Sequence, residues 1–194
     1  MSTGLIFGSF DPPHLGHLLL AKSALSVVDE VKFIPAYQNP FKEHNASFET
    51  RCNMLERLID SYPSLCENIG ICYIEGIVND RYQNTYTYKV LEEIHKILDN
   101  VYIIVTEETL KEIPKWKNSQ WILDNSKFIL VNRTSWDNYN ANIEYDISSP
   151  FNLDIHSVHI RQMIKFGGNP CPFIPESVYT IIKKRGLYGY SNTI

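Results

Sequence analysis

The chain has 194 residues, 44% of them hydrophobic, and a formal net charge of −4. This length favours a single domain, which we expect over residues 1–190, and the hydrophobic content is sufficient for a buried core. The negative charge argues against a general nucleic-acid binder, which presents a basic face, but not against a phosphorylated small molecule, whose site needs only local positive charge.

Apolar runs and helical spacings alternate from the start of the chain. Leu5–Phe7 is a short apolar run typical of a buried strand, and a helix is predicted over Leu15–Val28. Val31–Pro35 is a second apolar run, and helical spacing follows over Phe48–Tyr62. Ile69–Ile77 alternates between apolar and polar residues, which predicts a third strand.

The same alternation continues to the end of the chain. A helix is predicted over Thr87–Leu98, where apolar residues share one face. Val101–Val105 and Phe128–Val131 are wholly apolar, which is typical of central strands in a parallel sheet. An edge strand is predicted at Ile143–Ile147, and a last helix is predicted from Pro175.

Repeated strand and helix units of this kind predict an α/β protein. We expect a Rossmann-like open parallel sheet with helices on both faces and a small C-terminal helical part. In such sheets ligands bind beyond the carboxyl ends of the strands, near the point where the strand order reverses. The turn that follows the first strand lies at that edge.

That turn contains the most informative residues of the chain. His14 and His17 open the first helix, and side chains three residues apart lie on the same side of a helical turn. Backbone N–H groups there are unpaired and the helix dipole is positive, so the residues predict an anion site that most naturally binds phosphate. A metal pair with Asp11 as third ligand, or two surface histidines, are the alternatives.

The segment from Gly8 to His17 resembles the His-x-Gly-His signature of the nucleotidyltransferase superfamily. Its longer form, Gly-Ser-Phe-Asp-Pro-x-His-x-Gly-His, is similar to that of the nicotinate and nicotinamide mononucleotide adenylyltransferases of NAD synthesis. The resemblance implies that His14 and His17 hold the phosphates of ATP. It also implies that Gly8, Ser9 and Phe10 contact ATP.

Two further basic residues match the same family. Lys42 ends the segment Asn39-Pro40-Phe41-Lys42, and the resemblance implies that it approaches the triphosphate. Arg161 ends a segment that resembles Ile-Ser-Ser-Thr-x-Ile-Arg, and the resemblance implies that it pairs with the triphosphate. A solvated loop lysine and a helix-surface arginine are the alternatives. With His14 and His17, these residues form the expected catalytic set.

The chain departs from the family pattern at two places on the ATP side. Thr106-Glu107-Glu108 stands where the family has Gly-Ala-Asp, so Glu108 is expected to accept from a ribose, while Thr106 adds a β-branched side chain. His156 replaces a serine and Val158 a threonine, whereas Ser157 is retained. The resemblance implies that His156 and Ser157 contact ATP.

The expected mononucleotide site lies on two other segments. Thr85-Tyr86-Thr87 precedes a helix, where Thr85 or Thr87 can cap it. The resemblance implies that the backbone of this triplet recognises the pyridine ring and its carboxylate or amide. It also implies that Trp116 stacks on the ring; the alternative is that Trp116 or Trp121 packs in the core.

The reaction that the resemblance implies is adenylyl transfer, in which the 5′-phosphate of a pyridine mononucleotide attacks the α-phosphorus of ATP and pyrophosphate leaves. Mg²⁺ is expected to bridge triphosphate oxygens and needs few protein ligands, so no protein metal site is expected. Another nucleotidyltransferase of the superfamily, a non-catalytic nucleotide sensor and a metal-dependent hydrolase remain alternatives. The sequence leaves open the choice between nicotinate and nicotinamide, and whether the chain forms a homo-oligomer.

The cysteines and apolar segments predict a cytoplasmic protein that is not held in a membrane. The four cysteines include no Cys-x-x-Cys pair, so we expect reduced thiols. Residues 1–4 lead directly into an apolar run, so no signal peptide is expected. No apolar stretch approaches the ~18 residues that a membrane-spanning helix needs.

Overall fold

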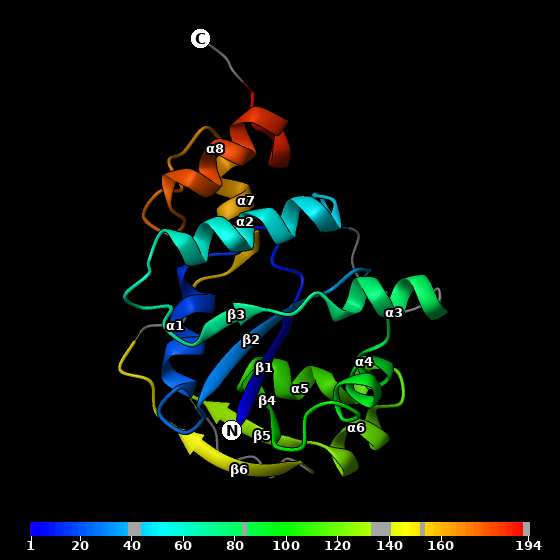
Figure 1. Ribbon diagram of the computed structural model, residues 1–194. Coiled ribbons are helices and arrows are strands. Elements are labelled where there is room, and N and C mark those ends of the chain that lie inside the picture. The colour runs from blue at the N-terminus through cyan, green and yellow to red at the C-terminus, as the bar shows by residue number, and fades with distance from the viewer. Residues whose placement is uncertain (39–43, 83–84, 133–140, 152–153, 192–194) are drawn as a thin grey trace.

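The computed structural model describes residues 1–38, 44–82, 85–132, 141–151 and 154–191. Its centre is a 6-stranded sheet with the strand order β3-β2-β1-β4-β5-β6, and every pairing is parallel (Figure 1). The strands are β1 Thr3–Gly8, β2 Glu30–Pro35, β3 Ile69–Ile71, β4 Val101–Thr106, β5 Lys127–Val131 and β6 Asn142–Ile147.

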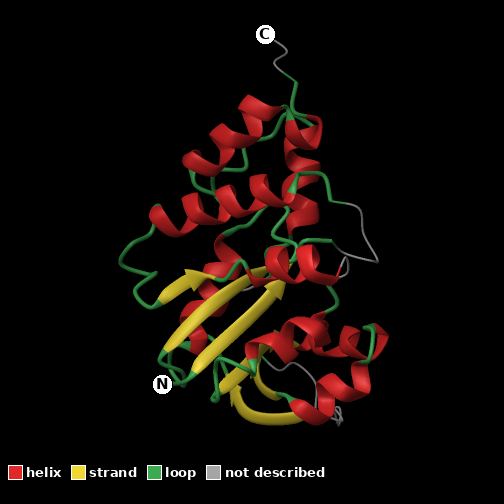
Figure 2. Cartoon of the chain, turned by 45° about the vertical axis from the view of Figure 1, so that its right-hand side comes forward, coloured by secondary structure: helices red, strands yellow, loops and turns green. Residues whose placement is uncertain are grey.

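Helices cover both faces of this sheet (Figure 2). They are α1 Leu15–Ala24, α2 Phe48–Asp60, α3 Ile74–Tyr82, α4 Thr87–Ile94, α5 Glu107–Glu112, η1 Ile113–Lys115, α6 Ser119–Asn125, α7 Ser157–Lys165, α8 Glu176–Arg185 and η2 Leu187–Gly189. The predicted Rossmann-like α/β fold is therefore confirmed.

Alternation along the strands divides the core into two apolar layers. In β1, Ile6 belongs to the layer covered by α1, α2, α7 and α8, whereas Leu5 belongs to the layer covered by α3 to α6. In β4, Ile104 and Ile103 divide in the same way. Because successive side chains of a strand point to opposite faces, a strand buried on both faces must be apolar throughout.

The strand order reverses between β1 and β4, which are neighbours at the centre of the sheet. The chain leaves β1 toward one side and β4 toward the other, so a crevice opens beyond their carboxyl ends. The turn after β1, which runs to the start of α1, lies at this crevice. So does the start of α5, which follows β4 directly.

The prediction of a strand over Ile69–Ile77 is wrong beyond Ile71. Strand β3 ends there and α3 begins at Ile74. Ile74 and Val78 are one helical turn apart and both pack on the apolar layer below α3, whereas Ile77 is 62% exposed. The same apolar residues therefore fit a helical spacing, and only the helix buries the correct ones.

Two predicted helices end four residues early. Helix α1 stops at Ala24 and α4 at Ile94, rather than at Val28 and Leu98. In both cases the next residues form a turn that leads into a strand, and the N–H of Val28 and that of Leu98 still donate to the last helical carbonyl. The apolar residues of these turns continue the core, which explains why the helical spacing extends past the helix.

The C-terminal helices form the small part expected beyond the sheet, and they lie over α2 (Figure 1). Pro175 is the N-cap of α8, and Gly186 ends the helix with a φ of 59° in the left-handed region. Arg185 donates to the Thr50 hydroxyl on α2 at 3.0 Å. The Ser61 and Ser177 hydroxyls, at the far end of the same helix pair, are 2.8 Å apart.

Candidate active site

The turn after β1 is fixed by the side chain of Phe10. This residue has a φ of 50°, and its ring is buried, 2% exposed. The ring packs edge-on against Phe33 and against His17, with centroids 5.4 and 4.9 Å apart. Because the ring is in the core, the backbone of Phe10 is the part that can contact a nucleotide.

His14 and His17 form a stacked pair at the start of α1. Their ring centroids are 3.7 Å apart, and the backbone N–H of His14 donates to Nδ1 of His17 at 3.1 Å. Because Nδ1 accepts this hydrogen bond, a neutral His17 carries its proton on Nε2. His17 is thereby oriented as a hydrogen-bond donor at the N-terminus of the helix.

Burial keeps both imidazoles uncharged. It lowers the pKa of His17 from 6.5 to about 3, and lowers the pKa of His14 well below 6.5. The proximity of His156 lowers both pKa values further. In the free protein the pair therefore offers hydrogen-bond donors rather than fixed positive charge.

The start of α7 is attached to the same turn. The Ser157 hydroxyl donates to the Pro12 carbonyl at 2.8 Å, and Nη1 of Arg161 donates to the Asp11 carbonyl at 2.7 Å. Both expected phosphate ligands thus use one donor to hold α7 against the turn. Arg161 keeps further N–H groups for an anion, because a guanidinium carries five donors.

Gly16 permits this close approach. A Cβ at Gly16 would lie 3.0 Å from the His14 ring and 3.2 Å from the side chain of Ile155. The glycine between the two histidines therefore lets the segment before α7 pack directly on the start of α1.

Asp11 is held by structural hydrogen bonds. It is 4% exposed; Oδ1 accepts from the Tyr188 hydroxyl at 2.6 Å, and Oδ2 accepts from the Asn45 backbone N–H at 2.7 Å. Both carboxylate oxygens are thus used to fix the turn, and Asp11 is not positioned as a third metal ligand. Among the described residues there is no cluster of three His, Cys, Asp or Glu side chains that could hold a metal ion.

Glu108 and His156, both expected to contact ATP, come close together at the starts of α5 and α7. Nδ1 of His156 lies 4.0 Å from a carboxylate oxygen of Glu108, and Nε2 lies 3.0 Å from Asp154. Thr106, which adds a β-branched side chain where the family has glycine, caps α5: its hydroxyl accepts from the Thr109 N–H at 3.5 Å. Two of the departures from the family pattern, Glu108 and His156, are therefore neighbours in the structure.

A cavity of about 430 Å³ lies beside the first turn. It has the size of a small-molecule site. Its walls include all four residues expected at the mononucleotide site, Thr85, Tyr86, Thr87 and Trp116, and two of those expected at ATP, Gly8 and Ser9. Lys42 lies outside the described residues; the described chain resumes at His44, whose Nε2 is 3.2 Å from the Ser9 hydroxyl.

Comparisons with known proteins show the family to which the chain belongs. The sequence model of the Cytidylyltransferase-like family matches residues 5–163. A relative from Hydrogenobaculum sp., named "Probable nicotinate-nucleotide adenylyltransferase", is 31% identical over 198 residues, which cover 98% of this chain and 100% of the relative. The chain belongs to the nicotinate-nucleotide adenylyltransferase family. A relative of the same name from Oceanobacillus iheyensis is 29% identical over 96% of both chains.

A solved structure shares the fold of this adenylyltransferase-family chain. The Plasmodium falciparum nicotinic acid mononucleotide adenylyltransferase complexed with NaAD superimposes with a TM-score of 0.81 at 19% identity, over 98% of this chain and 99% of that one. The same parasite protein complexed with APC gives a TM-score of 0.80.

Two tryptophans of this adenylyltransferase-family chain, Trp116 and Trp121, occupy different places. Trp116 lines the cavity, in an extended backbone directly after η1. Trp121 lies on α6, where its ring contacts those of Tyr88 and His95, each with centroids 6.4 Å away. Of these two described tryptophans, Trp116 is thus the one in a position to meet a ligand in the cavity.

Sequence reasoning missed Arg51, which connects the two loops at the crevice. Its side chain is fully buried; Nη1 donates to the Ser9 carbonyl and Nη2 to the Ala36 carbonyl, both at 2.6 Å. Nε donates to the Ala46 carbonyl at 3.2 Å. One signal pointed to it: Arg51 falls on the same apolar stripe of α2 as Leu55 and Leu58.

Sequence reasoning also missed Glu75. Glu75 lies in the segment Ile69–Ile77, for which the sequence predicts a strand. In the structure it belongs to α3, and its buried side chain lines the cavity. Its Oε2 accepts from the Tyr37 backbone N–H at 2.7 Å. A carboxyl within an otherwise apolar stretch was the signal available in the sequence.

Proposed function

We propose that the chain transfers AMP from ATP to nicotinate mononucleotide or nicotinamide mononucleotide, giving the dinucleotide and pyrophosphate in NAD biosynthesis. The observation that carries this proposal is that a pair of histidines and a small-molecule cavity lie side by side at the crevice. The stacked pair His14 and His17 lies at the start of α1, and a cavity lined by Thr85 and Trp116 lies beside it. Its family relatives carry the name of this activity.

The residues present suit an in-line transfer between two phosphates. The mononucleotide's 5′-phosphate oxygen attacks the α-phosphorus of ATP, a new P–O bond forms, and the bond to pyrophosphate breaks. The attacking oxygen is already anionic, so no strong general base is required. His17, His14 and Arg161 act by donating hydrogen bonds to phosphate oxygens and by orienting them.

The substrate is taken as MgATP. The turn offers neutral imidazoles and a guanidinium, while its one carboxylate, Asp11, is engaged with Tyr188 and Asn45. This set suits a phosphate whose magnesium ion is held by its own oxygens and by water. The ion neutralises charge on the triphosphate, and the protein supplies the donors around it.

The test is an incubation of the purified chain with MgATP and each mononucleotide separately. We expect pyrophosphate release that depends on the mononucleotide, with the dinucleotide identified by chromatography. MgATP alone and the mononucleotide alone are the controls. Tight nucleotide binding without turnover would instead favour a non-catalytic sensor of the same fold.

We also propose that residues 1–190 act as a single nucleotidyltransferase domain in the cytoplasm. Two of the free cysteines, Cys52 and Cys66, are buried, which suits a reducing compartment. Among the described residues no helix combines the length and the apolar character needed to cross a bilayer.

The Trp116→Ala variant is expected to weaken mononucleotide binding several-fold to tenfold, with little change for ATP. An aromatic face stacked on the pyridine ring contributes roughly 0.5–1.5 kcal/mol beyond buried area. The measurement is the Kd of each ligand by calorimetry. Trp121→Ala is the matched control and is expected to lower Tm instead, so a mononucleotide defect in that variant would contradict the assignment.

A further inference from the structure

The C-terminal end of the chain reaches back to the turn that carries the two histidines. The Tyr188 hydroxyl donates to Oδ1 of Asp11 at 2.6 Å, across 177 residues of sequence, and both side chains are buried. A bond of this length is typical of a hydroxyl that donates to a carboxylate, which is a strong hydrogen bond. Tyr188 is not one of the residues that line the cavity, so it meets the site through Asp11.

Tyr188 has a backbone conformation that an aromatic residue rarely adopts. Its φ is 59° and its ψ is 28°, in the left-handed region. Gly186 and Gly189, in the same turn, have φ values of 59° and 75°, and glycine adopts such angles without a steric cost. A strained non-glycine residue persists where the surrounding structure fixes it, and such residues gather at functional sites. The side chain, which a glycine would lack, is therefore the reason for a tyrosine at this position.

The contact from Tyr188 is one of several that join the C-terminal part of the chain to the turn. Helix α7 donates to the carbonyls of residues 11 and 12, and η2, which contains Tyr188, packs on α7. The Phe173 carbonyl accepts from the Leu15 N–H at 2.9 Å. These other contacts reach backbone groups of the turn. Tyr188 instead holds a side chain, and so fixes the orientation of the Asp11 carboxylate.

Asp11 transmits this restraint to the histidines. Its Oδ2 accepts from the Asn45 backbone N–H at 2.7 Å, so the carboxylate is held between the loop before α2 and the C-terminal end of the chain. It lies three residues before His14, whose backbone N–H orients the His17 ring at 3.1 Å. Without the Tyr188 hydroxyl, Oδ1 loses a donor in a buried place, where an anionic oxygen requires one. We expect the carboxylate to turn and the residues after it to shift.

The Tyr188 hydroxyl remains a donor under neutral conditions. Burial and the adjacent carboxylate of Asp11 raise the pKa of Tyr188, whereas the charges of Arg161 and Arg51 act in the opposite direction. The hydroxyl therefore keeps its proton, and a carboxylate can only accept it.

We propose that Tyr188 is a positioning residue for adenylyl transfer: by holding the Asp11 carboxylate, its hydroxyl fixes the turn so that His14 and His17 meet the phosphates in the geometry of the transition state. This inference rests on the proposed function. A displacement of about 1 Å at reacting groups costs about a hundredfold in rate, even when its origin lies far from the chemistry. The loss of one hydroxyl displaces the turn by less, so we expect an effect of about tenfold.

The test compares Tyr188→Phe with the wild-type protein, with MgATP and each mononucleotide as substrates. The variant keeps the buried ring, so the fold should be retained, which a thermal melt followed by circular dichroism checks. We expect kcat and kcat/KM to fall equally, by about tenfold, with the KM for the mononucleotide unchanged. The reason is that the displaced donors act on charge that develops in the transition state. A purely structural role would lower Tm and leave the kcat of the folded protein unchanged.

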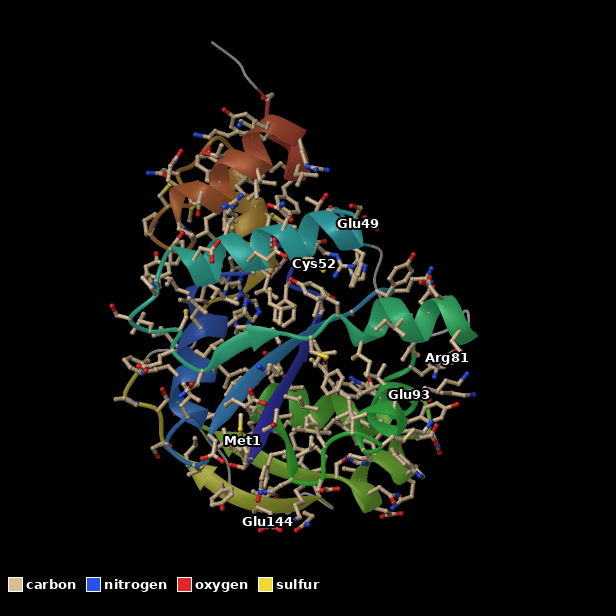
Figure 3. All side chains as sticks on the ribbon, viewed as in Figure 1. Met1, Glu49, Cys52, Arg81, Glu93 and Glu144 are labelled. Carbon is tan, nitrogen blue, oxygen red and sulfur yellow. The ribbon has the colours of Figure 1, made fainter. Side chains whose placement is uncertain are left out.

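Arg185→Met is the matched control. Arg185 donates at 3.0 Å to Thr50 on α2, between the residues Glu49 and Cys52 that are labelled in Figure 3. The variant removes a hydrogen bond that holds the same C-terminal part, but at a place away from the turn. We therefore expect Tm to fall while kcat stays at the wild-type value.

A double-mutant cycle tests whether Tyr188 acts through Asp11. Asp11→Ala should itself lower kcat, and Tyr188→Phe should have no further effect in that background, because both changes remove the same interaction. An equal tenfold fall in both backgrounds would contradict the proposal. If Asp11→Ala does not fold, Asp11→Asn takes its place; its acceptor is uncharged, so the effect of Tyr188→Phe should become smaller than in the wild-type background.

The outcomes separate this inference from the proposed function. A wild-type kcat in Tyr188→Phe overturns the role of Tyr188, and so does an equal fall in Arg185→Met. If Tyr188→Phe does not fold, a wild-type kcat in Asp11→Asn overturns it. If the wild-type protein turns over neither mononucleotide with MgATP, the proposed function itself fails, and with it this inference.

Discussion

Replacing His17 by alanine lowers kcat about a hundredfold, with a smaller effect on mononucleotide binding. The Nε2–H of His17 is fixed as a donor because Nδ1 accepts the His14 N–H at 3.1 Å. A donor directed at the charge that develops in the transition state contributes roughly 3 kcal/mol, which corresponds to about a hundredfold in rate. Steady-state kcat and KM for both substrates give the measurement.

Two matched variants of His17 separate the acceptor role of Nδ1 from the donor role of the Nε2–H group. His17→Asn keeps an acceptor near the position of Nδ1, so the bond to the His14 N–H and the Tm should be retained while kcat falls. His17→Gln places an N–H near the position of Nε2 and should recover part of kcat. If only the KM for ATP rises in His17→Ala, His17 stabilises the bound substrate and the transition state equally, and the role assigned here is wrong.

The sheet could be predicted because its strands are buried on both faces. Val101–Val105 is buried at every position, so its sequence is apolar throughout. It shows no helical spacing, and a helix is therefore not predicted as an alternative. Ile69–Ile77 lacks this property. Its apolar residues fit both the alternation of a strand and the spacing of a helix. Whether a strand or a helix forms depends on the apolar layer beneath α3, whose residues come from other parts of the chain.

The same distinction applies to the site. His14, Gly16 and His17 act within one helical turn, so their spacing alone indicates a donor pair at a helix start. Arg51 and Glu75 act through backbone groups far away in the sequence, such as the Ser9 carbonyl and the Tyr37 N–H. Their identity as buried polar residues is visible in the sequence, but the partners that explain it appear only once the sheet has brought the loops together.

Replacing Arg51 by methionine lowers the free energy of unfolding by roughly 3 kcal/mol or more. Methionine has a similar length and no donors, so the carbonyls of Ser9, Ala36 and Ala46 lose their hydrogen bonds inside the protein. A buried acceptor left without a partner costs about 1–3 kcal/mol. Urea denaturation of both proteins gives the measurement, and Arg51→Lys, which keeps one cation and fewer donors, should fall between them.

Burying a guanidinium is itself unfavourable, and apolar replacements of buried ion pairs are often neutral or stabilising. That result applies when both partners are replaced. Here the partners are backbone carbonyls of the loops after β1 and β2, which no side-chain substitution removes. If Arg51→Met nevertheless matches the wild-type stability, these loops reach water when Arg51 is absent. The first turn would then be displaced, and kcat should fall although the fold is intact.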